Sequence, residues 1–139
     1  MMRLAGLVLF LAAAAALDAR AGRLPNWLPL AGLATASLLA ARAAAMPDMV
    51  LGLIVAILAV RFAGFPSGDQ GAAAAAGAFA GWAGSTTGVS IALLLTLWRW
   101  NRGQFKPGGP WLPWLAAGFA PWVIAESLEK LLVLSWWKP

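Results

Sequence analysis

The chain contains no cysteine and no histidine, and only five of its 139 residues are acidic. The missing residue types exclude disulfides, thiolate nucleophiles, His-based catalytic triads and most zinc sites. Charged residues make up 11% of the chain, whereas soluble domains typically carry about 25%. If this protein catalyses a reaction, its few carboxylates are therefore the leading candidates for the chemistry.

Hydrophobic residues account for 62% of the chain, and the mean hydropathy is +0.79. So few charged groups cannot cover the surface of a soluble domain of this length, and the lipid bilayer is the expected solvent. The ten basic residues are scattered between apolar runs and form no stripe, which argues against nucleic acid as a partner. We therefore expect a single integral-membrane domain over residues 1–139, with no cofactor and no metal.

Apolar runs separated by glycine, proline and charged residues predict an all-α, polytopic membrane protein with about six transmembrane helices. The expected helices cover about residues 3–17, 27–45, 49–63, 70–83, 86–100 and 111–137. The stretch 70–100 is divided near residues 83–86, because 31 residues rising 1.5 Å each would exceed a hydrocarbon core of roughly 30 Å. The first run, followed by Ala19-Arg20-Ala21, also resembles a secretory signal peptide, and this alternative is left open.

Six crossings would place the loops 18–26, 61–69 and 99–110 on one side of the membrane. These loops hold six of the ten basic residues, namely Arg20, Arg23, Arg61, Arg99, Arg102 and Lys106. The positive-inside rule then makes this side cytoplasmic and leaves both termini non-cytoplasmic.

Three of the five acidic residues have simple structural interpretations. Asp48 lies in an expected turn on the outer side and calls for no special role. Glu126 is four residues before Lys130, so the two predict a helical ion pair near a surface, with Glu129 beside them.

The other two acids, Asp18 and Asp69, are 51 residues apart in sequence. Asp18 closes the first expected helix and Asp69 opens the fourth, with one complete hairpin between them. Both should therefore lie at the same membrane boundary. A helix cap at Asp69 and a polar stop at Asp18 are the structural alternatives. As a pair, two carboxylates sharing one proton can activate water and polarise a peptide carbonyl without metal or histidine.

Three sequence blocks carry a family resemblance. They are Asp18-Ala-Arg-Ala-Gly-Arg-Leu-Pro-Asn26, Gly68-Asp-Gln-Gly-Ala-Ala-Ala-Ala-Ala-Gly-Ala-Phe-Ala-Gly81 and Gly109-Pro-Trp-Leu-Pro-Trp-Leu-Ala116. In order and spacing they resemble the prepilin peptidases (type IV leader peptidases), a family of GxGD membrane aspartic proteases. The compact chain is most similar to the form that serves tight-adherence (Flp) pili.

The resemblance implies a role for each matching residue. Asp18 and Asp69 would be the catalytic pair, and Gly68 would give the backbone room for Asp69 to face Asp18. Pro25 and Asn26 would set how the chain enters the second helix, and Gly77 falls where the family's helix carries a glycine. The implied activity is removal of the short basic leader from a prepilin or pseudopilin at the cytoplasmic face of the bacterial inner (plasma) membrane. The lipid bilayer and the pilus assembly machinery would be further partners.

Two positions depart from the family pattern: Pro66 replaces the first glycine of GxGD, and Gly71 replaces a lysine. Bifunctional relatives also methylate the new N-terminus through a segment with cysteine pairs, so a chain without cysteine is expected to lack methyltransferase activity. A catalytically degenerate, non-enzymatic membrane subunit of a pilus or secretion system is the main alternative. A small transporter, with the two aspartates as proton or cation sites, is the third hypothesis.

Overall fold

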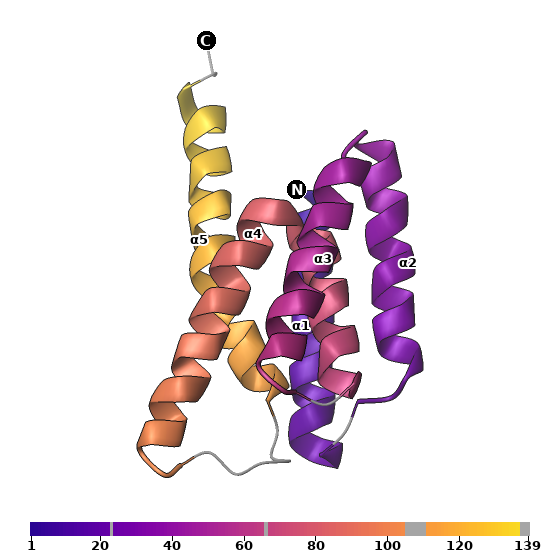
Figure 1. Cartoon of the computed structure of the whole chain (residues 1–139). Helices are drawn as coiled ribbons and strands as arrows, with labels where there is room; N and C mark the ends of the chain where they lie inside the picture. The colour runs from indigo at the N-terminus through magenta and orange to yellow at the C-terminus, as the bar shows by residue number, and fades with distance from the viewer. Residues whose placement is uncertain (23, 66, 105–110, 137–139) are drawn as a thin grey trace.

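A computed structural model of the chain describes residues 1–22, 24–65, 67–104 and 111–136. These residues form five α-helices and no strand. The helices are α1 Met2–Ala21, α2 Trp27–Arg42, α3 Met46–Phe62, α4 Ser67–Asn101 and α5 Leu112–Trp136. Figure 1 shows them as a bundle in which the chain reverses direction between successive helices. The all-helical fold class expected from the sequence is confirmed for the described residues.

Helix α4 consists of two helical segments that meet at Gly81, whose φ of 72° and ψ of −170° are not helical. The Ser85 hydroxyl donates a hydrogen bond to the Gly77 carbonyl at 3.2 Å. In an uninterrupted helix, positions eight residues apart would lie about 12 Å from one another. The chain therefore turns back sharply at Gly81 (Figure 1). A break within residues 70–100 is confirmed, but the expected place near residues 83–86 is wrong, because those residues are helical and the break lies at Gly81.

The ends of two other helices differ from the expected ones. Helix α1 continues to Ala21 and ends at Gly22, which adopts a left-handed conformation, so Asp18 lies in its last turn and not after it. Helix α3 begins at Met46, with Pro47 in its first turn, where a missing backbone N–H has no effect on the helix. Asp48 therefore belongs to the first turn of α3, and the expected turn at residues 46–48 is wrong.

The first segment of α4 lies in the centre of the bundle. Its alanines are almost completely buried, with Ala72, Ala73, Ala75 and Ala76 all 0% exposed. A Cβ built at Gly77 would lie 2.5 Å from the Gly52 carbonyl oxygen and 2.7 Å from the Ala56 side chain. Side chains this small let α3 and α4 approach backbone to backbone, as in many membrane helix pairs.

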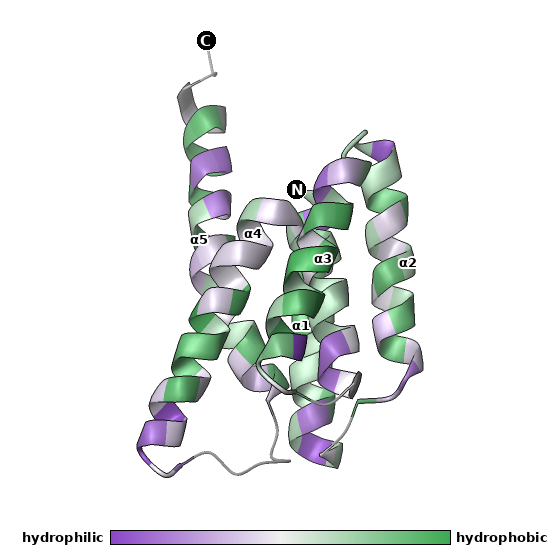
Figure 2. Cartoon of the chain, viewed as in Figure 1, coloured by the Kyte–Doolittle hydropathy of each residue, from purple (hydrophilic) through white to green (hydrophobic). Residues whose placement is uncertain are grey.

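The outer surface of the bundle is rich in apolar side chains. Leu9, Leu38 and Leu94, for example, are 71%, 68% and 65% exposed. Hydrophilic residues gather towards the two ends of the bundle, with largely hydrophobic residues between them (Figure 2). By length and composition, Met2–Ala21 and Gly68–Asn101 could each cross a membrane, and the second stretch is divided at Gly81. These features point to membrane association.

The two ends of the bundle have different compositions. One end, here called the aspartate end, holds the last turns of α1 and α3, the end of α4 and the first turns of α2, α4 and α5 (Figure 1). The opposite end holds the start of α1, the turn between α2 and α3 and the break at Gly81. This arrangement places Asp18 and Asp69 at the same end of the bundle, as the hairpin between them in the sequence predicts (Figure 1).

Candidate carboxylate site

Asp18 is buried in the last turn of α1, with only 5% of its surface exposed. Its Oδ2 accepts a hydrogen bond of 3.0 Å from the backbone N–H of Leu112, the first residue of α5. The first amides of a helix have no partner within the helix, and the helix dipole favours a negative charge beside them. Asp18 therefore caps α5 from another helix.

Trp111 holds the start of α5 in place. Its side chain is 2% exposed, and its Nε1–H donates to the Thr96 hydroxyl at 3.0 Å. Thr96 in turn donates to the Ala92 carbonyl at 2.8 Å, so its hydroxyl is fixed by its own helix. The Trp111 ring also packs on Phe65, with 4.3 Å between the ring centroids. The end of α4 and the segment before α4 thus position the helix terminus that Asp18 caps.

Asp69 lies in the first turn of α4 and is half-buried. It lies at the same end of the bundle as Asp18, on a helix that packs against α1 (Figure 1). The neighbouring Gln70 donates from Nε2 to the Phe65 carbonyl at 2.9 Å, which joins the first turn of α4 to the segment that contacts Trp111. The structure therefore brings Asp18 and Asp69 into one site, beside the first turns of two helices.

This arrangement suits general acid–base chemistry. Carboxylates near one another resist ionising together, so one can hold a proton while the other accepts one. The ionised group can activate a water molecule, and the protonated group can donate to a carbonyl oxygen. The described residues contain no cluster of three or more His, Cys, Asp or Glu side chains that could hold a metal ion.

The residues expected to support the pair have different surroundings. The Pro25 carbonyl accepts from the Leu28 N–H at 3.1 Å, which forms the turn into α2. Asn26 occupies the N-cap position of α2, although its side chain makes no capping hydrogen bond. A Cβ at Gly68 would touch no described atom within 4 Å, so the structure gives no steric reason for glycine there. Gly77, in contrast, is required by its contact with α3.

Of the two positions that depart from the family motif, the structure describes Gly71 but not Pro66. Pro66 lies outside the described residues, as do Arg23, Lys106, Gly109 and Pro110. Gly71 faces α2, and a Cβ built there would make an ordinary contact of 3.4 Å with the Pro29 side chain.

Sequence reasoning missed the residues around the first turn of α5. Leu112 contributes only a backbone amide to the site, and no pattern of side chains in the sequence predicts such a contribution. Thr96 offered a signal, because it is a single polar residue inside the apolar run 91–98. A hydroxyl in such a run needs a partner, and the tryptophan before the last helix supplies one.

Asp48 requires a correction. It accepts a hydrogen bond of 2.9 Å from the Trp82 N–H, the first amide after the break, and forms an ion pair of 3.2 Å with Arg3. The interpretation that Asp48 needs no special role is therefore wrong. The ion pair expected between Glu126 and Lys130 is confirmed, with 2.7 Å between Oε1 and Nζ.

The structure is an all-helical bundle with features that point to membrane association and with Asp18 and Asp69 at one end (Figure 1). Comparisons with protein-family models, with curated proteins and with solved structures found no match.

Proposed function

We propose that the protein is an intramembrane aspartic endopeptidase of the prepilin peptidase type, with Asp18 and Asp69 as its catalytic pair. One observation carries this proposal: two of only five acids in the chain, from α1 and α4, lie at the same end of the bundle (Figure 1), where Asp18 is buried and Asp69 is half-buried. Acidic groups in a membrane domain are energetically unfavourable and usually functional. The order of the sequence blocks described above adds independent support.

In this proposal one carboxylate takes a proton from a water molecule, and the water oxygen attacks the scissile carbonyl carbon. The other carboxyl group donates to the carbonyl oxygen as the tetrahedral intermediate forms. When the C–N bond breaks, a proton passes from the pair to the departing amine, and a hydroxyl proton of the intermediate returns to the pair as the new carboxyl group forms. The substrate is a prepilin or pseudopilin, cut between its basic leader and its hydrophobic helix.

The proposal also includes a multi-pass arrangement in the bacterial inner membrane. The three loops of the aspartate end would be cytoplasmic, and both termini non-cytoplasmic, in line with the positive-inside rule. Helices α2 and α3 have 16 and 17 residues, which is about 24–26 Å against a hydrocarbon core of roughly 30 Å. The proposed six crossings therefore include short ones, for which a locally thinner bilayer would compensate.

A second function is favoured by the hydrogen bond between Asp18 and the Leu112 amide. If capping α5 is the whole role of Asp18, the chain is a catalytically degenerate subunit that binds pilin helices without cutting them. The departure at Gly71 supports this alternative as well.

Co-expression with a prepilin from the same organism separates the two functions. Asn keeps a side-chain oxygen that can still accept the Leu112 N–H, while it loses the ability to exchange a proton. We expect wild type to release the leader, and Asp18→Asn and Asp69→Asn each to abolish release while the protein accumulates normally. The mass of the pilin N-terminus identifies the cut.

Glu129→Gln is the matched control, since Glu129 is exposed near the opposite end of the bundle. It makes the same carboxylate-to-amide change and should leave cleavage intact. Normal processing by both aspartate variants would refute the peptidase proposal. A wild-type protein that supports pilus assembly without cutting any prepilin would establish the degenerate subunit instead.

A further inference from the structure

A cavity of about 610 Å³ lies at the opposite end of the bundle from Asp18 and Asp69. The start of α1, the end of α2, the first turn of α3, the break in α4 and the second half of α5 all contribute to its wall. The cavity is thus separate from the carboxylate site, and nothing in the proposed peptidase reaction uses it.

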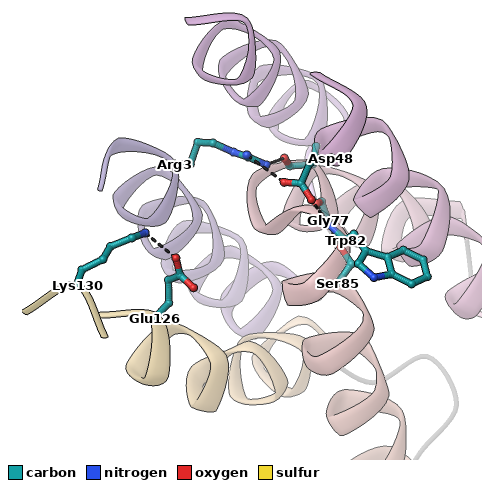
Figure 3. A network of polar contacts seen from close by, with 8 residues as sticks. Arg3, Asp48, Gly77, Trp82, Ser85, Glu126 and Lys130 are labelled. Carbon is teal, nitrogen blue, oxygen red and sulfur yellow. Dashed lines mark hydrogen bonds and ion pairs between the residues drawn. The ribbon is translucent and has the colours of Figure 1, made fainter. Parts of the chain in front are cut away.

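The cavity is lined by more basic than acidic side chains. Arg3, Arg42 and Lys130 line it together with Asp48 and Glu126. Two of the three cations already have acidic partners, because Arg3 pairs with Asp48 at 3.2 Å and Lys130 with Glu126 at 2.7 Å (Figure 3). The third cation, Arg42, makes no hydrogen bond or ion pair with another side chain or backbone group in the described residues, and its side chain is exposed.

Arg3 has a donor without an acceptor. Its two terminal nitrogens donate to Asp48 and to the Ala78 carbonyl, each at 3.2 Å. Its Nε is buried and has no hydrogen-bond partner within the part of the chain that the structure describes. A buried donor without a partner is energetically unfavourable. Because Nε is buried, it is out of reach of a ligand in the cavity, and Arg3 contributes to the cavity wall only as a side chain that is already paired.

The remaining wall of the cavity is apolar. Leu4, Leu39, Phe79 and Trp122 line it alongside the charged residues. Leu38, next to Leu39 on α2, is 68% exposed on the outer surface. A ligand with an anionic head and an apolar body would match both halves of this wall.

From these observations we propose that the cavity binds the phosphate headgroup of an anionic phospholipid, with Arg42 and Lys130 beside the phosphate and the glycerol and upper acyl chains against the apolar wall. A phosphodiester offers several acceptor oxygens and one negative charge, which complements the single side-chain cation in excess. This inference needs membrane association but is independent of the peptidase proposal.

The test measures lipid binding to the purified full-length protein in a neutral detergent. Short-chain phosphatidylglycerol, short-chain phosphatidylcholine and inorganic phosphate are titrated separately, with the thermal unfolding midpoint and native mass spectrometry as readouts. We expect phosphatidylglycerol to bind more tightly than phosphatidylcholine. Arg42→Gln should weaken phosphatidylglycerol binding roughly fivefold, the effect of about one cation near an anionic headgroup.

Arg61→Gln is the matched control, because Arg61 is exposed at the aspartate end and should not affect this binding. Lys130→Gln is a second variant on another helix, expected to weaken binding as Arg42→Gln does. Equal affinities for the two lipids, or equal losses in Arg42→Gln and Arg61→Gln, would overturn the proposal. Inorganic phosphate that displaces phosphatidylglycerol at comparable concentration would also overturn it, since the apolar wall would then contribute nothing.

Discussion

The Asp18 carboxylate of α1 accepts a hydrogen bond of 3.0 Å from the Leu112 amide of α5, 94 residues later in the chain. The same side chain lies at the end of the bundle that holds Asp69 (Figure 1). One buried group thus caps a helix and belongs to the candidate catalytic pair. Variants of Asp18 must therefore separate a loss of stability from a loss of chemistry.

The stability role of Asp18 is tested by comparing Asp18→Ala with Asp18→Asn. Removing a side-chain cap typically destabilises a protein by about 0.5–2 kcal/mol. We expect Asp18→Ala to lower the free energy of unfolding by that amount, and Asp18→Asn to lower it less, because the amide oxygen still accepts. Thermal or denaturant unfolding in detergent measures both, with Glu129→Ala as the exposed control. Equal stability of Asp18→Ala and wild type would contradict the capping role.

The break in α4 should depend on glycine at position 81. Its φ of 72° with ψ of −170° is a combination that residues with a Cβ avoid, at a penalty of about 1–3 kcal/mol. A Cβ there would also collide with the Asp48 carboxylate. We expect Gly81→Ala to destabilise the protein by at least about 2 kcal/mol.

Gly68→Ala is the control for this substitution. Gly68 lies in the first turn of α4, and a Cβ there would meet no described atom. Alanine at a compatible position is neutral or stabilising by about 0.4–1 kcal/mol. Similar unfolding midpoints for Gly81→Ala and Gly68→Ala would show that the break does not require glycine.

The close contact of α3 with α4 predicts a second contrast between two glycines of the same helix. A Cβ at Gly77 would lie 2.5 Å from the Gly52 carbonyl oxygen, whereas a Cβ at Gly71 would lie 3.4 Å from the nearest Pro29 atom. Forcing atoms into a packed core typically destabilises by about 1–3 kcal/mol. Gly77→Ala should therefore lower the unfolding midpoint and Gly71→Ala should not. The reverse order would mean that the two helices are not packed at Gly77.

The proposed membrane orientation is tested with single cysteines, since the natural chain has none. Ala41→Cys lies near the end of α2 and Gln104→Cys just after α4, both at exposed positions. In spheroplasts, whose inner membrane is intact, a membrane-impermeant maleimide should label Ala41→Cys and leave Gln104→Cys unlabelled. Permeabilised cells should show labelling of both. Labelling of Gln104→Cys alone in spheroplasts would show that the orientation is the reverse of the proposed one.

Features that depend on neighbouring residues were predictable from the sequence. The helical segments follow from apolar runs bounded by proline, glycine and charge, and the ion pair of Glu126 with Lys130 follows from their spacing on one helix. The need for a break between residues 70 and 100 follows from length alone. The common end of Asp18 and Asp69 follows from the hairpin between them.

The exact place of the break and the partners of the buried polar groups were decided by tertiary structure. Residues 77, 81, 84 and 88 are all glycines, and the sequence does not say which of them interrupts the helix. Gly81 does so where Asp48 of α3 meets the Trp82 amide and Arg3 of α1 meets the Ala78 carbonyl. These contacts satisfy the backbone groups that the break exposes.

The sequence by itself thus determined an apolar helical chain with few acids and two of them at one end. Tertiary structure decided that Asp18 caps α5, that Asp48 and Arg3 stabilise the break, and that a basic cavity lies at the end of the bundle opposite Asp18 and Asp69. The physical reason is the distance along the chain over which each kind of interaction acts. Helix periodicity arises within a few residues, whereas a buried carboxylate takes whichever donor the packing of distant helices brings to it.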